Sequence, residues 1–125
     1  MFKQILLVGL GGAIGSIFRF LTSSLMARYA LSNFPLGTFI ANVLGCFILG
    51  ICIGVFGKNP TENENLRLLF VTGFCGGYTT FSTFAAENIQ MLQQQNYVML
   101  ATYTLVSLLV GFLAVAIGLS LGKSW

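Results

Sequence analysis

Charged residues are scarce in this sequence. Only 7% of its 125 residues are charged and 56% are hydrophobic, whereas about a quarter of the residues in a soluble domain are charged. The six basic residues are scattered singly, so the chain has no basic patch of the kind that binds nucleic acid. The composition predicts a protein of the lipid bilayer with no nucleic-acid partner.

The side chains of hydrolysis and group transfer are also missing. Histidine is absent, and of the three acidic residues, Glu62, Glu64 and Glu87, only Glu87 falls in an apolar stretch. Catalysis needs a poised base, nucleophile or metal, so we expect no enzyme activity. The three cysteines lie in apolar stretches without CxxC spacing, and we interpret them as small buried hydrophobic residues.

Four long apolar runs make up most of the chain. A helix that crosses a bilayer takes about 20 residues, so the predicted fold is an all-α membrane protein with four transmembrane helices. We expect one domain over residues 1–125, with spans at about 4–28, 36–56, 62–90 and 97–121. The first run has no small-residue cleavage site after it, and we expect it to remain as a span. Thr61 and Glu64 fit a capping box that would start the third span near Glu62.

The third run contains the least helix-like stretch, GFCGGYTTFSTFAAEN at residues 73–88. Adjacent glycines followed by β-branched Thr79 and Thr80 weaken helix propensity. We therefore expect this helix to be broken near residues 75–80. A break at membrane depth frees backbone carbonyls that must face protein, water or an ion, so the pattern predicts a binding site there.

Small residues at intervals of four predict close helix packing in the other spans. Gly11 and Gly15 form the clearest pair in span one, and similar pairs occur in spans two and four at Gly50 and Gly54, and at Gly118 and Gly122.

Polar residues inside the spans have two interpretations each. Arg19 shares a helical face with Gly12, Ser16 and Ser23; it either snorkels to the headgroups or places a fixed positive charge beside an aqueous entry. Asn42 is either an interhelical hydrogen-bonding residue or a donor that lines a conduction path.

The hydroxyls of span four and the basic residues at the helix ends complete the pattern. Tyr103 and Ser107 lie four apart on one face, which puts two hydroxyls in line. Structural hydrogen bonding explains these hydroxyls as well as a role in a conduction path does. Alternating spans put four basic residues on one side, Lys3, Lys58, Arg67 and Lys123, against Arg28 on the other. The positive-inside rule then favours cytoplasmic termini.

Hydrogen-bond donors dominate the polar groups of the spans and favour an anion over a cation. Arg19 is positive, and the ring edges of Phe81 and Phe84 carry the positive part of the aromatic quadrupole. These rings are three residues apart and would follow each other along a path, although most membrane phenylalanines simply face lipid or another helix. The donors are Asn42, Thr79, Thr80, Ser82, Thr83, Tyr103 and Ser107.

Two other classes compete with an anion channel. Small multidrug exporters also have four spans and form dimers, but they exchange protons through an intramembrane acid, usually in span one, where this chain has none. A purely structural membrane protein would show no anion flux.

The chain closely resembles the Fluc (CrcB-type) fluoride channels over essentially its whole length. The matching motifs are Gly11-Gly12-x-x-Gly15-x-x-x-Arg19, Gly37-Thr38-x-x-x-Asn42-x-x-Gly45, Gly73-Phe74-Cys75-Gly76-Gly77-x-Thr79-Thr80-Phe81-Ser82-Thr83-Phe84, and Glu87. The resemblance implies passive, fluoride-selective export across the bacterial inner membrane, which protects the cell from fluoride toxicity. It also implies an antiparallel, dual-topology homodimer with two pores.

The resemblance further implies the roles of individual residues. Phe81 and Phe84 would line the pores, Asn42 would lie near the vestibule, Ser82 and Thr83 would be pore hydroxyls, and Arg19 would give the vestibule its positive potential. Tyr103 and Ser107 would begin a polar track, in which Gly111 stands where a hydroxyl is expected. The carbonyls of Gly76 and Thr79 from both subunits would hold a structural sodium ion. The biased distribution of basic residues departs from ideal dual insertion.

Overall fold

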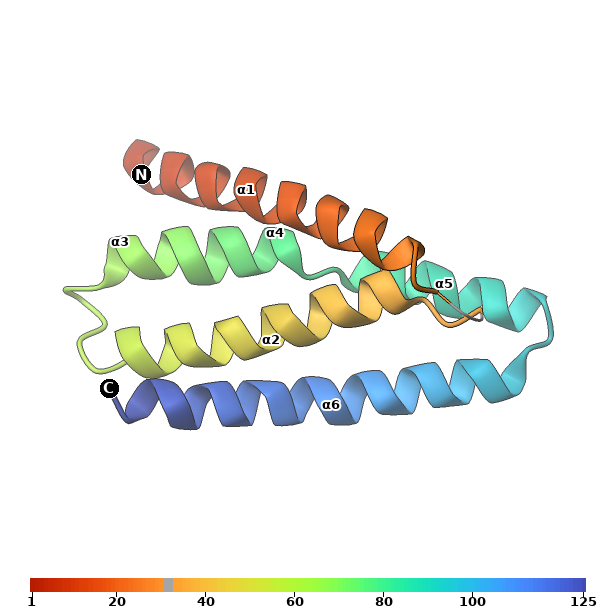
Figure 1. Ribbon diagram of the computed structural model, residues 1–125. Helices are drawn as coiled ribbons and strands as arrows, with labels where there is room; N and C mark the ends of the chain where they lie inside the picture. Colours follow the sequence, from red (N-terminus) through yellow and green to blue (C-terminus); the bar gives the residue numbers. More distant parts are fainter. Residues whose placement is uncertain (31–32) are drawn as a thin grey trace.

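The structure is a computed structural model that describes residues 1–30 and 33–125, and its elements are all helical within these ranges (Figure 1). Spans one, two and four are the single helices α1 (Phe2–Ala27), α2 (Leu36–Phe56) and α6 (Tyr97–Lys123). The third span is a succession of shorter helices, α3 (Glu64–Leu66), η1 (Arg67–Cys75), α4 (Gly76–Tyr78) and α5 (Phe81–Gln93). The predicted fold class, four membrane helices of which the third is broken, is confirmed.

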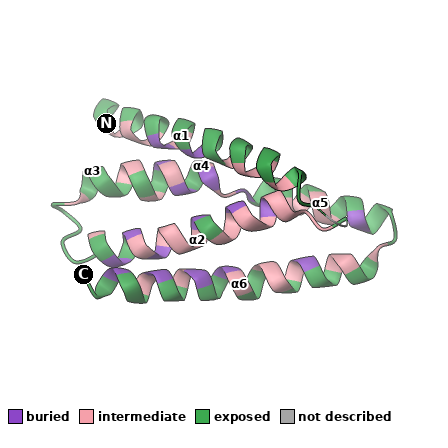
Figure 2. Ribbon diagram, in the orientation of Figure 1, coloured by how far each residue is buried: buried purple, intermediate pink, exposed green. Residues whose placement is uncertain are grey.

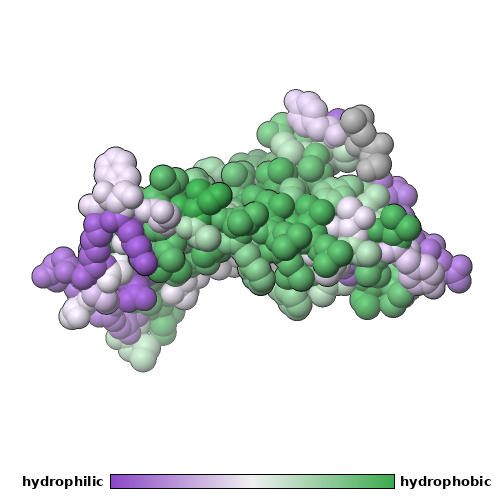
Figure 3. Space-filling view, turned by 90° about the horizontal axis from the view of Figure 1, so that it is seen from below, coloured by the Kyte–Doolittle hydropathy of each residue, from purple (hydrophilic) through white to green (hydrophobic). Residues whose placement is uncertain are grey.

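The surface has the polarity of a membrane protein. Helices α1, α2 and α6 are each long and apolar enough to cross a bilayer. Figure 3 shows a broad apolar band with hydrophilic residues at both ends of the molecule. Both termini and the α2–α3 loop lie at one end in Figure 1. The segments that carry Lys3, Lys58, Arg67 and Lys123 therefore meet at that end, and Arg28 lies near the other.

The break falls where the sequence predicts it. Helix α4 ends at Tyr78, and the backbone becomes extended at Thr79 (φ −84°, ψ 158°) and Thr80 (φ −149°, ψ 117°). Extended dihedrals suit β-branched residues. Helix α5 then restarts at Phe81, with the Thr80 hydroxyl accepting a hydrogen bond from the backbone N–H of Thr83.

Close glycine contacts hold the helices together in two layers. On one side α1 packs against η1 and α4, where a Cβ at Gly11 or Gly15 would collide with backbone carbonyls of η1. On the other, α2 packs against α6 and Gly54 meets Gly122 backbone to backbone. Figure 2 shows the buried residues on these facing sides. The predicted small-residue contacts are confirmed.

Two features at the start of the third span differ from the sequence-based expectation. The capping box was wrong: the helix begins at Glu64, its N-cap Asn63 makes no side-chain cap bond, and Glu64 Oε1 instead accepts a hydrogen bond from Gln4 Nε2 at 2.9 Å. A contact with α1 thus replaces a local one. The π-helical winding of η1 was not predicted; π segments are rare and are often found at functional sites.

Candidate functional site

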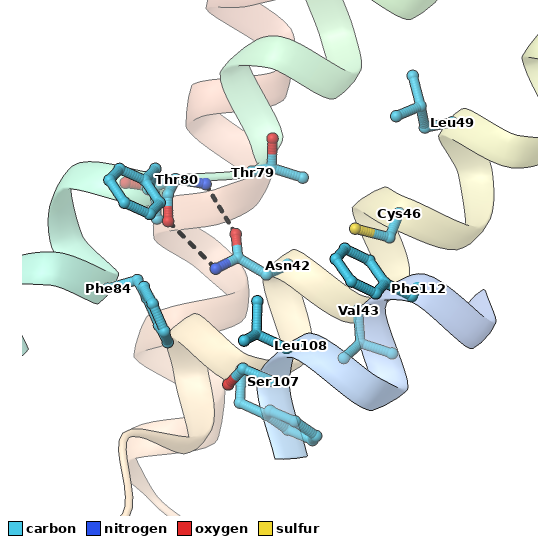
Figure 4. A pocket seen from close by; sticks show the side chains of 13 residues that line it. Asn42, Val43, Cys46, Leu49, Thr79, Thr80, Phe84, Ser107, Leu108 and Phe112 are labelled. Carbon is cyan, nitrogen blue, oxygen red and sulfur yellow. Dashed lines mark hydrogen bonds between the residues drawn. The ribbon is translucent and has the colours of Figure 1, made fainter. Parts of the chain in front are cut away.

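A cavity of about 290 Å³ lies beside the break, between α2, α5 and α6 (Figure 4). Most of its wall is apolar, as expected at membrane depth. The predicted site residues that line it are Asn42, Thr79, Phe81, Phe84 and Ser107, and Gly111 lies among them. The break therefore brings together residues from three spans that are distant in sequence.

The two phenylalanine rings occupy different positions in this cavity. Their centroids are 6.0 Å apart with the planes tilted by 42°, so they follow each other as the three-residue spacing predicts. Phe81 lines the cavity and is 79% exposed. Phe84 is half-buried and packs on the ring of Tyr103 at 5.1 Å between centroids. One ring is therefore fixed by protein and the other is available to a neighbouring surface.

Ser107 brings an unused hydroxyl to the cavity. Its Oγ is buried and makes no hydrogen bond within residues 1–30 and 33–125. A buried polar atom without a partner is costly, and in native structures it commonly marks a ligand, ion or water site. Ser107 and Phe84 thus line the same cavity, and the Ser107 hydroxyl is a donor that the described part of the chain leaves unused.

Asn42 holds the broken backbone in place. Its Oδ1 accepts from the N–H of Thr80 at 2.7 Å, and its Nδ2 donates to the carbonyl of Thr80 at 3.1 Å (Figure 4). The interhelical hydrogen bond that the sequence left open is therefore confirmed. An amide nitrogen carries two hydrogens and only one is used here, so the role of Asn42 as a donor to a passing ion stays a prediction.

Tyr103 is buried behind the cavity rather than lining it. Its side chain is 0% exposed, and its hydroxyl donates to Glu87 Oε1 at 3.0 Å. Thr38 Oγ1 donates to Glu87 Oε2, also at 3.0 Å. No partner of Glu87 was predicted from the sequence, although Thr38 and Asn42 lie on one face of their helix. That shared polar face was the signal that could have pointed to this cluster.

A second cavity, of about 290 Å³, lies on the α1 side of the break. Arg19 lines it and is half-buried, with Ser16 and Ser23 from its own helix face. Arg19 thus lies on the small, polar face that its helical spacing predicts, and its role as a fixed charge beside an aqueous entry stays a prediction. Thr83 lines this second cavity, whereas Ser82 is exposed and lines neither of the two.

The carbonyls of Gly76 and Thr79 have lost their helical partners. In an α-helix they would accept from the amides of Thr80 and Thr83, but those amides donate to Asn42 Oδ1 and Thr80 Oγ1. Gly76 is exposed, with open space where a Cβ would stand. Freed carbonyl oxygens suit a hard cation. No group of three or more His, Cys, Asp or Glu that could hold a metal occurs in the described part of the chain.

In the described part of the chain, α1, α2 and α6 are long enough to cross a membrane and the third span is broken. With donors and aromatic edges around a cavity at the break, this arrangement defines a multi-pass membrane transport protein. The profile of the family described as CrcB-like protein, Camphor Resistance (CrcB), matches residues 6–119. The chain belongs to this family.

Relatives in three organisms support the assignment, and each is described as "Fluoride-specific ion channel FluC". The relative in Azobacteroides pseudotrichonymphae genomovar. CFP2 is 50% identical over 118 residues, which are 94% of each chain. That in Gloeothece citriformis is 45% identical over 96% of this chain and 97% of its own. That in Flavobacterium psychrophilum is 38% identical over 97% and 98%.

Proposed function

We propose that this chain is a fluoride-specific ion channel of the bacterial membrane and not an enzyme. The observation that carries the proposal is the cavity at the helix break, which is lined by Phe81, Phe84 and Ser107, whose hydroxyl has no partner among the described residues. Ring edges and neutral hydroxyls attract an anion only weakly, so it can both enter and leave. The relatives described as fluoride channels identify the anion.

The flux is passive. Hydrogen fluoride is a weak acid that crosses the membrane and dissociates inside, which traps the anion, and the membrane potential drives fluoride out through a channel without ATP or protons. A proton-coupled exporter has less support, because both carboxylate oxygens of Glu87 already accept hydrogen bonds from hydroxyls and span one has no acid.

The proposed assembly is an antiparallel homodimer with two pores. Phe81 is 79% exposed in the single chain, so the cavity is incomplete on its side, and a second copy would supply the missing wall. The basic residues gathered at one end favour a single orientation in the membrane. A measurement of insertion orientation therefore tests the antiparallel arrangement directly.

A structural sodium ion between the two subunits completes the proposal. The donor set supports it, since the carbonyls of Gly76 and Thr79 are released from the helix. The ion would neutralise the facing carbonyl dipoles of two broken helices. In each chain, Asn42 and the Thr80 hydroxyl keep these carbonyls free by binding the amides that would otherwise cover them.

The deciding experiment compares fluoride and chloride efflux from liposomes that contain the purified protein, with an ion-selective electrode and valinomycin to clamp the potential. We expect rapid fluoride efflux, little chloride efflux and no requirement for a pH gradient. Equal flux of the two halides, or flux only under a pH gradient, would contradict the proposal.

A further inference from the structure

The two cavities beside the break meet at one residue. The first is lined by Asn42, Phe81, Phe84 and Ser107, and the second by Arg19. Thr80 is the residue that the described linings of both cavities have in common. It is 8% exposed, and because it belongs to both linings we call it the partition between the cavity lined by Arg19 and the cavity lined by the aromatic rings.

The backbone of Thr80 is fixed, whereas its hydroxyl can turn. Asn42 forms hydrogen bonds with both the N–H and the carbonyl of Thr80, so neither backbone group is available to bind an ion. The hydroxyl donates to Thr83 Oγ1 at 3.0 Å, accepts from the Thr83 amide at 3.2 Å, and shares a longer hydrogen bond of 3.4 Å with Ser82 Oγ. Rotation about χ1 gives up these three bonds and points the hydroxyl elsewhere, and threonine populates more than one χ1 rotamer even in helices.

An anion that moves between the cavities needs a donor at the partition. On one side it has the guanidinium of Arg19, and on the other the ring edges and the hydroxyl of Ser107. Thr38, which also lines the Arg19 cavity, already donates to Glu87. A dehydrated anion between two such spaces is costly without hydrogen bonds, and the Thr80 hydroxyl is placed to supply one.

The geometry points to Thr80 as the transfer residue between the two cavities: its hydroxyl leaves Thr83 and donates to the fluoride ion as the ion crosses. This inference rests on the proposed channel function. It assigns to Thr80 a role in conduction beyond that of an N-cap of α5.

Three substitutions separate the two roles. Thr80→Val keeps the shape and removes the hydroxyl, Thr80→Ser keeps the hydroxyl, and Thr80→Asp keeps a strong N-cap acceptor but places a negative charge at the partition. Thr22→Val is the matched control, because Thr22 shares a part-buried hydroxyl hydrogen bond with Tyr78 away from both cavities. The assay is fluoride efflux from proteoliposomes, with elution volume in detergent as the check on folding.

We expect fluoride efflux to fall at least tenfold in Thr80→Val and to background in Thr80→Asp, while Thr80→Ser and Thr22→Val stay within about threefold of wild type. If Thr80→Asp conducts like wild type, the residue is only a cap and the inference is wrong. Equal flux in the Val and Ser variants also overturns it, and this comparison decides alone if the Asp variant does not fold. Absence of flux in the wild type would instead contradict the channel function itself.

Discussion

Replacement of Asn42 by alanine should destabilise the broken span and stop conduction. The substitution removes both hydrogen bonds to Thr80, of 2.7 and 3.1 Å. The backbone N–H and carbonyl of Thr80, which is only 8% exposed, then lose these partners. Each unsatisfied buried group costs about 1–3 kcal/mol. Thr80 borders two cavities through which water can reach it. We therefore expect a loss of unfolding free energy in the lower part of the range for two such groups, about 2–4 kcal/mol.

The unfolding free energy can be measured by denaturant titration in detergent micelles, with fluoride efflux measured on the same preparations. Asn88→Ala is the matched control, because Asn88 also makes two hydrogen bonds, donating to the Phe84 carbonyl at 3.0 Å and accepting from Thr104 at 2.9 Å. We expect a comparable loss of stability in the control with flux retained. Wild-type stability in Asn42→Ala would refute the argument, as would equal loss of flux in the two variants.

Four further substitutions test the cavity and the helix packing. Phe84→Ile and Phe81→Ile should each reduce fluoride efflux at least tenfold without preventing assembly, since the positive ring edge is lost while bulk is kept; unchanged efflux would count against the aromatic path. Ser107→Ala should lower efflux yet leave the unfolding free energy within about 1 kcal/mol of wild type, because the hydroxyl has no partner to lose within residues 1–30 and 33–125; a large destabilisation would contradict this. Gly118→Ala should lower the yield of folded protein, because the added methyl group would collide with the carbonyl of Phe47, and elution in detergent measures this.

Features encoded by neighbouring residues were predictable from the sequence. The break needs only the glycines at 76 and 77 and the β-branched pair that follows, since weak helix propensity and extended dihedrals are local properties. The close approach of α1 to η1 and α4, and of α2 to α6, follows from glycines repeated at helical spacing. The polar face of Arg19 is likewise a matter of spacing along one helix.

Features that join distant segments were not predictable in the same way. Asn42 and Thr80 are 38 residues apart, and Thr38 and Glu87 are 49 apart. Nothing in the local sequence says which backbone groups an intramembrane amide will satisfy. The sequence could therefore only leave both roles of Asn42 open. The π-helical winding of η1 has no local signal that we recognise, and its apolar residues would suit an ordinary α-helix.

The two phenylalanines show where a sequence pattern stops and tertiary structure takes over. The two are equivalent in spacing but not in their contacts. Phe84 packs on the ring of Tyr103. The Tyr103 hydroxyl donates a hydrogen bond to Glu87, which also accepts one from Thr38 of α2. The ring of Phe81 contacts that of Phe84, and 79% of the Phe81 residue is exposed. Because a ring that three helices position is less free to move than one at an open edge, the two should differ in sensitivity to changes behind them. Loss of the Tyr103 hydroxyl should disturb the Phe84 side of the path first.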